Sequence, residues 1–226
     1  MTFPIKLTLL AAVLLPSANA DSLEAILSRM DVAAKNFKSV SATLKQSDYT
    51  AVIQDLSTPE SGLLRIKREK NGLEAIVDFT EPEPKKIIFK GHEAQMYYPK
   101  AHSLQIIELS KYMGTIDQFL LLAFGTSGTE LRKNYDVRSG GAETIDNIPT
   151  TRIELIPKTD EMKKVVTKIE LWIPDGKSDA IREKVSEPSD NYYTANYSNV
   201  QRNIPIPDSI FDFKPPKGTT ISRPQK

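Results

Sequence analysis

The chain has 226 residues, no cysteine, and 30 basic against 29 acidic residues, which gives a formal net charge of +1. A nucleic-acid-binding protein normally carries a clustered basic face, and this sequence has none, so nucleic acid is excluded as an expected partner. Without cysteines the fold can contain neither disulfides nor thiolate metal ligands. Its stability must come from a hydrophobic core, which a chain of this length can bury.

The first twenty residues have the three parts of a secretory signal peptide. Lys6 supplies the positive charge, residues 7–15 form an apolar run, and Ala18-Asn19-Ala20 is a small-x-small cleavage site. The run is shorter than the roughly 20 residues that a membrane-spanning helix needs, and a buried N-terminal helix is the alternative. No cysteine follows Ala20 for lipid attachment. We therefore expect a soluble, monomeric periplasmic protein with one domain over residues 21–226.

Residues 21–37 predict an amphipathic helix. Asp21 is a candidate N-cap, with Glu24 three residues later. Apolar residues then recur at spacings of three and four from Leu23 to Phe37, which places them on one face. This helix either packs on a core or covers the mouth of a cavity.

After the helix the apolar period changes to two, which is typical of strands with one buried face. Strands are predicted at 40–45, 64–67, 73–79, 86–90, 94–98, 103–109, 134–139, 150–156, 164–173, 180–186 and 192–200. Turn residues separate them, among them Asn71-Gly72, Asp146-Asn147 and Asp175-Gly176. The pattern predicts a mainly β domain (α+β) whose sheet is an antiparallel meander of about ten or eleven strands.

The segment 111–124 interrupts the alternation. It is apolar almost throughout, with Ile116, Phe119, Leu120 and Phe124, and a turn from Gly125 ends it. A helix that is apolar on nearly all sides must be covered on more than one of them. It is either a core helix inside a curved sheet or a lid whose outer side contacts a ligand.

Motifs that carry catalysis are absent. Neither His92 nor His102 belongs to a zincin pair, and Gly125-Thr126-Ser127-Gly128 lacks the spacing of a nucleophile elbow. The sequence contains no phosphate-binding loop and no calcium loop. We therefore predict no enzyme activity, no metal and no cofactor. A hydrolase remains the alternative if the fold brings two carboxylates together in a cleft.

Arg68 is unusual because it shares a strand face with Leu64 and Ile66. A buried guanidinium is costly unless its donors are bonded, and five donors can serve several backbone carbonyls. Either the strand ends at Lys67 and Arg68 reaches water, or Arg68 is a latch at a cavity rim that bonds a lid helix.

In the order of its motifs the chain resembles the LolA family of periplasmic lipoprotein carriers. The strand ends in Ile66-Lys67-Arg68, a Thr80-Glu81-Pro82 turn follows, and Gly91 to Pro99 is similar to the family's G-x-x-x-W-x-Y-x-P hairpin. The apolar segment 119–124 stands where the family has lid helices. The end, residues 211–219, is similar to F-x-F-x-P-P-x-G-V.

The resemblance implies an incompletely closed antiparallel β-barrel, covered by lid helices, that carries lipoprotein acyl chains between the membranes. It implies an inner-membrane ABC-type release complex and an outer-membrane receptor as partners, and an arginine at the position of Arg68 that bonds the lid. The residues expected to line the cavity are Leu44, Leu64, Ile66, Val77, Phe79, Met96, Phe119, Leu120 and Phe124. Glu69 replaces the proline that usually follows the arginine, so a carrier or sensor of another lipid or glycolipid remains the alternative.

Overall fold

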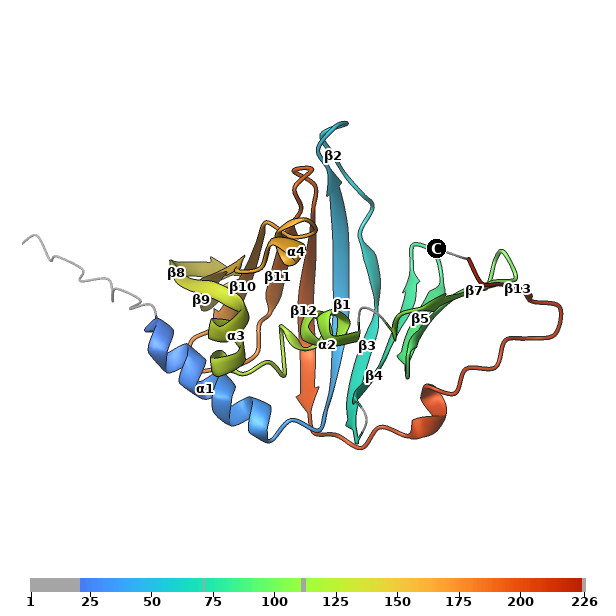
Figure 1. Cartoon of the computed structure of the whole chain (residues 1–226), viewed down its shortest axis with the longest axis horizontal. Coiled ribbons are helices and arrows are strands. Elements are labelled where there is room, and N and C mark those ends of the chain that lie inside the picture. Colours follow the sequence, from blue (N-terminus) through green and yellow to red (C-terminus); the bar gives the residue numbers. More distant parts are fainter. Residues whose placement is uncertain (1–20, 71, 111–112, 225–226) are drawn as a thin grey trace, which may run out of the picture.

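The structure, a computed structural model, describes residues 21–70, 72–110 and 113–224. The predicted signal peptide and Asn71 of the predicted turn lie outside these residues. Within them, thirteen strands form one sheet, antiparallel except for a parallel pair at one edge. The sheet curves but does not close, because β8 and β13 remain as its two edges (Figure 1). The predicted open, mainly β architecture is confirmed.

Two meanders make up the sheet. The first contains β1 (Ser39–Thr50), β2 (Asp55–Leu56), β3 (Glu60–Glu69), β4 (Gly72–Glu81), β5 (Lys85–Lys90), β6 (Glu93–Tyr98) and β7 (Ser103–Glu108). The second contains β8 (Tyr135–Ile145), β9 (Ile148–Pro157), β10 (Lys168–Pro174), β11 (Arg182–Ser186) and β12 (Tyr192–Arg202). Pairing of β1 with β12 joins them, and β13 (Thr220–Ser222) runs alongside β7.

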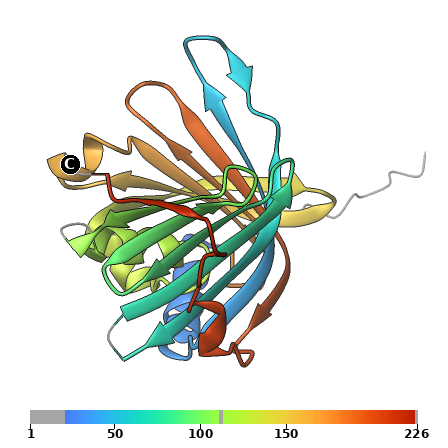
Figure 2. The same ribbon diagram turned by 90° about the vertical axis from the view of Figure 1, so that its right-hand side faces the viewer.

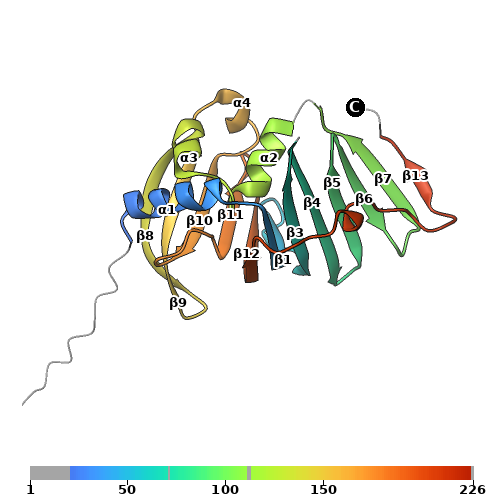
Figure 3. The same cartoon turned by 90° about the horizontal axis from the view of Figure 1, so that it is seen from below.

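Two helices cover the inner face of the second meander. They are α1 (Leu23–Lys35) and α3 (Gly128–Asn134), which lie over β8, β9 and β10 (Figure 3). Their backbones approach so closely that a Cβ on Gly128 would lie 2.4 Å from the Leu27 carbonyl oxygen, and glycine is therefore needed there. Ile26, Leu27 and Met30 of α1 enter the main hydrophobic core. The N-cap of α1 is Ser22, so the prediction of Asp21 was wrong.

The remaining helices described are α2 (Met113–Leu121), α4 (Asp160–Lys163) and the short 3-10 helix η2 (Asp208–Ile210). Of the predicted apolar segment 111–124, residues 111 and 112 lie outside the described residues, and α2 covers most of the rest. It lies over the inner face where the two meanders join (Figure 3). The predicted strand 164–173 begins later than expected, at Lys168, because the short helix α4 and a turn precede it.

The C-terminal segment covers part of the outer face, crossing β5 to β7 (Figure 2). Phe211 is almost fully buried and packs with Ile76 and Ile88 in a separate hydrophobic cluster. Phe213 lies 4.8 Å from the Tyr97 ring, centroid to centroid. The run of phenylalanines near the C-terminus therefore seals the outer face of this meander, so that its inner face alone is left to form a cavity.

Candidate functional site

An inner cavity of about 340 Å³ lies between α2 and the inner face of the sheet. Seven of the nine residues predicted for it line it, namely Leu44, Leu64, Ile66, Val77, Phe79, Phe119 and Leu120. Ile87, Phe89 and Ala195 add further apolar surface. Alternation along β1, β3 and β4 places the strand residues on the same face, while α2 supplies Phe119 and Leu120 from above.

Two predicted residues lie elsewhere. Phe124 follows α2 in a buried turn, where its ring meets Tyr197 edge-on at 4.8 Å. Met96 of β6 is half-buried opposite Ile87, outside the cavity lining. Phe124 therefore closes one end of the cavity from behind Tyr197 instead of lining it.

The cavity also has a polar end that the sequence analysis did not identify. Glu183 of β11 is buried there, with 3 % of its surface exposed. It accepts hydrogen bonds from the hydroxyls of Tyr197, at 3.0 Å, and Tyr193, at 3.4 Å. Burial raises the pKa of the Glu183 carboxyl to about 7, which the two tyrosine hydrogen bonds only partly offset. Strand alternation contained a signal, because Glu183 shares its face with buried Val185.

A second carboxylate, Asp48 of β1, lines the same cavity. Burial raises its pKa, and the charge of Glu60 raises it further. No serine, threonine, histidine or cysteine is among the described residues that line this cavity. The two carboxylates thus share a cleft, in which two tyrosine hydroxyls bond Glu183.

Arg68 lies at the end of β3, exposed, on the rim of a different groove of about 660 Å³. Its guanidinium sits 5.3 Å from the centre of the Phe37 ring. Its backbone N–H donates to the Lys38 carbonyl at 2.8 Å. Among the residues that the structure describes, its side chain forms no hydrogen bond or ion pair with α2.

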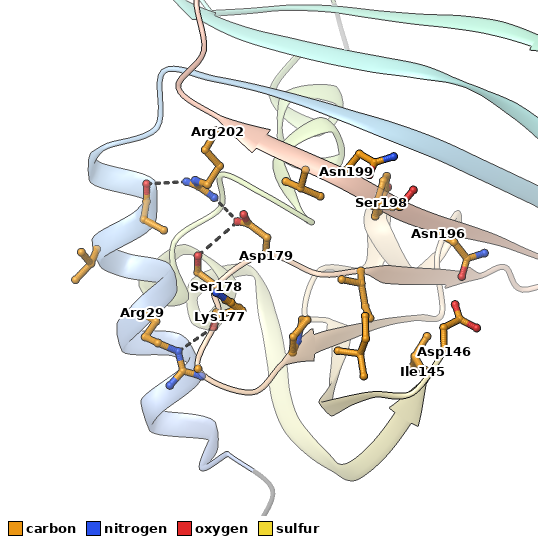
Figure 4. Close-up of a pocket in the computed structure, with 18 of the residues that line it drawn as sticks. Arg29, Ile145, Asp146, Lys177, Ser178, Asp179, Asn196, Ser198, Asn199 and Arg202 are labelled. Atoms are coloured by element: carbon orange, nitrogen blue, oxygen red, sulfur yellow. Dashed lines mark hydrogen bonds and ion pairs between the residues drawn. The ribbon is translucent and has the colours of Figure 1, made fainter.

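A different arginine bonds several carbonyls at once. Arg202, the last residue of β12, donates to the carbonyl of Phe124 at 2.7 Å and to that of Ala33 at 3.1 Å. It also pairs with Asp179 of the β10–β11 loop (Figure 4). Burial raises the pKa of Asp179 although Arg202 acts in the opposite direction. One guanidinium therefore ties the turn after α2 to α1 and to the sheet.

A larger cavity, of about 1140 Å³, lies on the other side of Tyr197. Helix α1, the loop before β11, the β8–β9 turn and the end of β12 surround it (Figure 4). Its wall mixes apolar residues such as Ile145 and Ile181 with amides, hydroxyls and charged groups. Tyr197 belongs to the lining of both cavities, so it lies between the inner cavity and a larger one whose lining contains more polar residues.

In the described part of the chain, no group of three or more histidine, cysteine, aspartate and glutamate side chains is placed to hold a metal ion. None of the helices described is long and apolar enough to cross a membrane.

Comparison with known proteins gives one family match. Residues 117–222 match the model of a family described as a predicted periplasmic protein, DUF2092. This chain is similar to that family. The description agrees with the predicted periplasmic location. No curated protein matches the sequence.

Several solved structures match this one at low sequence identity. An uncharacterized conserved protein from Thermus thermophilus is 13% identical, with a TM-score of 0.53 over 89% of this chain and 98% of that one. Lipoprotein LppX from Mycobacterium tuberculosis is 15% identical, with a TM-score of 0.49 over 82% and 99%. A putative outer membrane lipoprotein-sorting protein domain from Vibrio parahaemolyticus is 11% identical, with a TM-score of 0.46 over 83% and 94%. A LolA superfamily protein from Nitrosomonas europaea is 16% identical, with a TM-score of 0.39 over 85% of this chain and 98% of that one.

Proposed function

We propose that this protein is a periplasmic carrier that shields acyl chains in its inner cavity and moves them from the inner to the outer membrane. The observation that carries the proposal is an apolar cavity roofed by a helix whose own apolar residues, Phe119 and Leu120, face the sheet. Burying a methylene is worth about 0.8 kcal/mol, so an acyl chain leaves a membrane only for a surface of this kind.

Loading requires α2 to move, because the inner cavity is small for a lipid. Its 340 Å³ lies near the lower end of the range of about 300–1,000 Å³ for pockets that hold small molecules. Arg202 bonds the turn that follows α2, and Phe124 in this turn backs Tyr197. Release of the Arg202 bonds would free the end of the lid and open the inner cavity toward the larger one.

Arg202 is therefore a second candidate for the lid latch that was predicted at Arg68. Arg202 makes the multiple carbonyl bonds that were expected of Arg68, while Arg68 contacts the same Phe37 ring from β3. We propose Arg202 as the latch of the closed state, and Arg68 as a group that holds Phe37 at the hinge between α1 and β1.

Acylated lipoproteins are the proposed cargo, with an inner-membrane ABC-type release complex as donor and an outer-membrane lipoprotein receptor as acceptor. A carrier of this kind needs no catalysis, and we propose none. The second candidate is a carrier of another lipid with a larger polar head, such as a glycolipid. The amphiphilic cavity beyond Tyr197 favours it, because amides and hydroxyls there could bond a head group.

Native mass spectrometry of protein purified from the periplasm tests the proposal. Wild-type protein should carry a lipid or a triacylated peptide, whose mass separates the two cargoes. Leu120→Asp places a charge in the cavity lining and should abolish retention while circular dichroism stays native. Leu56→Asp is the matched control, because Leu56 is 51% exposed on β2, and it should retain lipid. A folded Leu120→Asp protein with normal lipid content would disprove the proposal.

A further inference from the structure

Tyr197 of β12 lies between the inner cavity and the larger cavity beside α1, here called the outer cavity, and it lines both. Tyr193 and Ala195, which precede it on the same strand face, line the inner cavity, whereas Val200 beyond it lines the outer one. The backbone N–H of Tyr197 donates to the Ile181 carbonyl at 2.8 Å, and Ile181 also lines the outer cavity. The boundary between the two cavities therefore passes through Tyr197.

Side-chain contacts hold the Tyr197 ring in this position. The ring meets Phe124 edge-on, with 4.8 Å between the ring centroids. Its hydroxyl donates a hydrogen bond of 3.0 Å to Glu183 on the inner side. Phe124 is itself held by the bond between its carbonyl and Arg202. A barrier that consists of one ring, one edge contact and one hydrogen bond can open by rotation of a side chain, without movement of a strand.

The two cavities differ in size and in lining. The inner cavity has a volume of about 340 Å³ and the outer one about 1140 Å³. Ile181 and Val200 continue the apolar surface beyond Tyr197, and the polar side chains of Asn196 and Ser198 line the same outer cavity (Figure 4). An acyl chain too long for the inner cavity would therefore find apolar surface for its methylenes, and partners for a polar head, on the far side of Tyr197.

We propose that Tyr197 sets the length of acyl chain that the closed protein accepts. A short chain fits the inner cavity and leaves the ring in place. A longer chain turns the ring aside, joins the two cavities and places its polar head in the outer one. Displacing the ring breaks its contact with Phe124 and its hydrogen bond, so a longer chain gains less than its added methylenes would give. The inference rests on the proposed function, because the inner cavity must hold the end of an acyl chain.

Displacement of the fluorescent apolar probe N-phenylnaphthylamine by saturated fatty acids, from hexanoate to hexadecanoate, tests this inference. Each methylene that enters the cavity should raise the affinity about fourfold, the equivalent of about 0.8 kcal/mol. For wild-type protein this rise should break off at the chain length at which Tyr197 must move. Tyr197→Ala removes the ring, so the fourfold rise should continue past that length. Tyr197→Phe keeps the ring and should keep the break.

Tyr193→Ala is the matched control. Tyr193 lies on the same strand, donates to the same Glu183 at 3.4 Å and lines the inner cavity but not the outer one. Its removal enlarges the inner cavity without joining it to the outer one. A break should therefore remain in Tyr193→Ala, at a slightly longer chain.

Ile181→Trp tests the far side of the boundary, because it narrows the outer cavity next to Tyr197. It should lower the affinity for chains longer than the break by at least about fourfold, the worth of one methylene, and leave shorter chains unchanged. This variant also carries the test if circular dichroism shows that Tyr197→Ala does not fold.

The length role of Tyr197 would be overturned, and the carrier proposal left standing, by any of three results. They are a wild-type affinity that rises without a break, a break that Tyr197→Ala shifts no further than Tyr193→Ala or Tyr197→Phe does, and an unchanged long-chain affinity in Ile181→Trp. If no fatty acid displaces the probe from wild-type protein, the carrier proposal fails and the length role fails with it.

Discussion

The inner face of one continuous sheet is tightly packed at β9 and β10 and hollow under α2, and the cavity beside α1 lies at the margin of the packed part. Under α1 and α3, residues such as Ile153, Leu155 and Leu171 have no exposed surface. Under α2, Phe119 and Leu120 are only partly buried, and a cavity separates them from β3 to β5. The strands obey the same alternation in both regions, so the difference lies in what fills the space between the covering helices and the sheet.

The two regions therefore have different roles, one in stability and one in ligand binding. Interiors of proteins are close-packed, and a cavity forfeits contacts that would otherwise stabilise the fold. The packed region under α1 and α3 supplies stability to the domain. The hollow region under α2 has fewer packing contacts, and it leaves the space that a ligand would fill.

A matched pair of leucine truncations is the strongest test of the contrast. Leu171→Ala, in the packed region, should lower the free energy of unfolding by about 4 kcal/mol, because it leaves a cavity in rigid surroundings. Leu120→Ala enlarges a space that already exists and should cost only about 1 kcal/mol. Urea denaturation of both variants measures the difference. Equal losses would show that the two regions do not differ as described.

The polar end of the hollow region should make stability depend on pH. The pKa of Glu183 is raised from 4.5 to about 7 in the folded protein, so between these values the unfolded chain binds fewer protons. The free energy of unfolding should therefore fall by about 3 kcal/mol as pH rises from 4.5 through 7. Glu183→Gln should remove this contribution, and Glu170→Gln should not. Parallel pH profiles for wild type and Glu183→Gln would contradict the burial of an ionisable Glu183.

Breaking the Arg202 bonds between the lid and the packed region should have an intermediate effect on the free energy of unfolding. Arg202→Leu leaves Asp179 without its partner, and the pair is only 22% and 18% exposed, so we expect a loss of about 2 kcal/mol. The double variant Arg202→Leu/Asp179→Leu should recover part of the loss. Hydrogen exchange should increase at residues 119–125 in Arg202→Leu before it increases in β9 and β10. Uniform exchange across the domain would argue against a latch specific to the lid.

Arg68→Leu should have the smallest effect on stability. Its exposed guanidinium over Phe37 is worth about 0.5–1 kcal/mol. If Arg68 also acts as a latch, this variant should load lipid readily and transfer it poorly to an acceptor. Transfer of a labelled lipoprotein measures this, with Arg68→Lys as a partial replacement. Wild-type loading and transfer by Arg68→Leu would leave Arg202 as the only candidate latch.

Alternation and turn residues were sufficient to predict most strands and the cavity face. The Asp146-Asn147 turn is one example, because both residues have positive φ between β8 and β9. Leu64 and Ile66 are another, because period two places both on the inner face. The two-residue strand β2 and the three-residue strand β13 were missed, since neither is long enough to show a period.

The arginines show where a local pattern stops being informative. Arg68 shares its strand face with apolar residues, and this parity drew attention to it. The carbonyls of Phe124 and Ala33 that Arg202 bonds lie 78 and 169 residues away along the chain. No periodicity within β12 encodes those partners, and only the three-dimensional fold brings them together.

Photo-crosslinking inside living cells tests most directly whether lipid occupies the inner cavity. Benzoylphenylalanine would replace Phe119, which lines the cavity, and in a separate control Val52, which is 92% exposed. Irradiation should produce a lipid or acylated-peptide adduct at position 119 and none at position 52. No adduct at position 119, or equal adducts at both positions, would contradict the account.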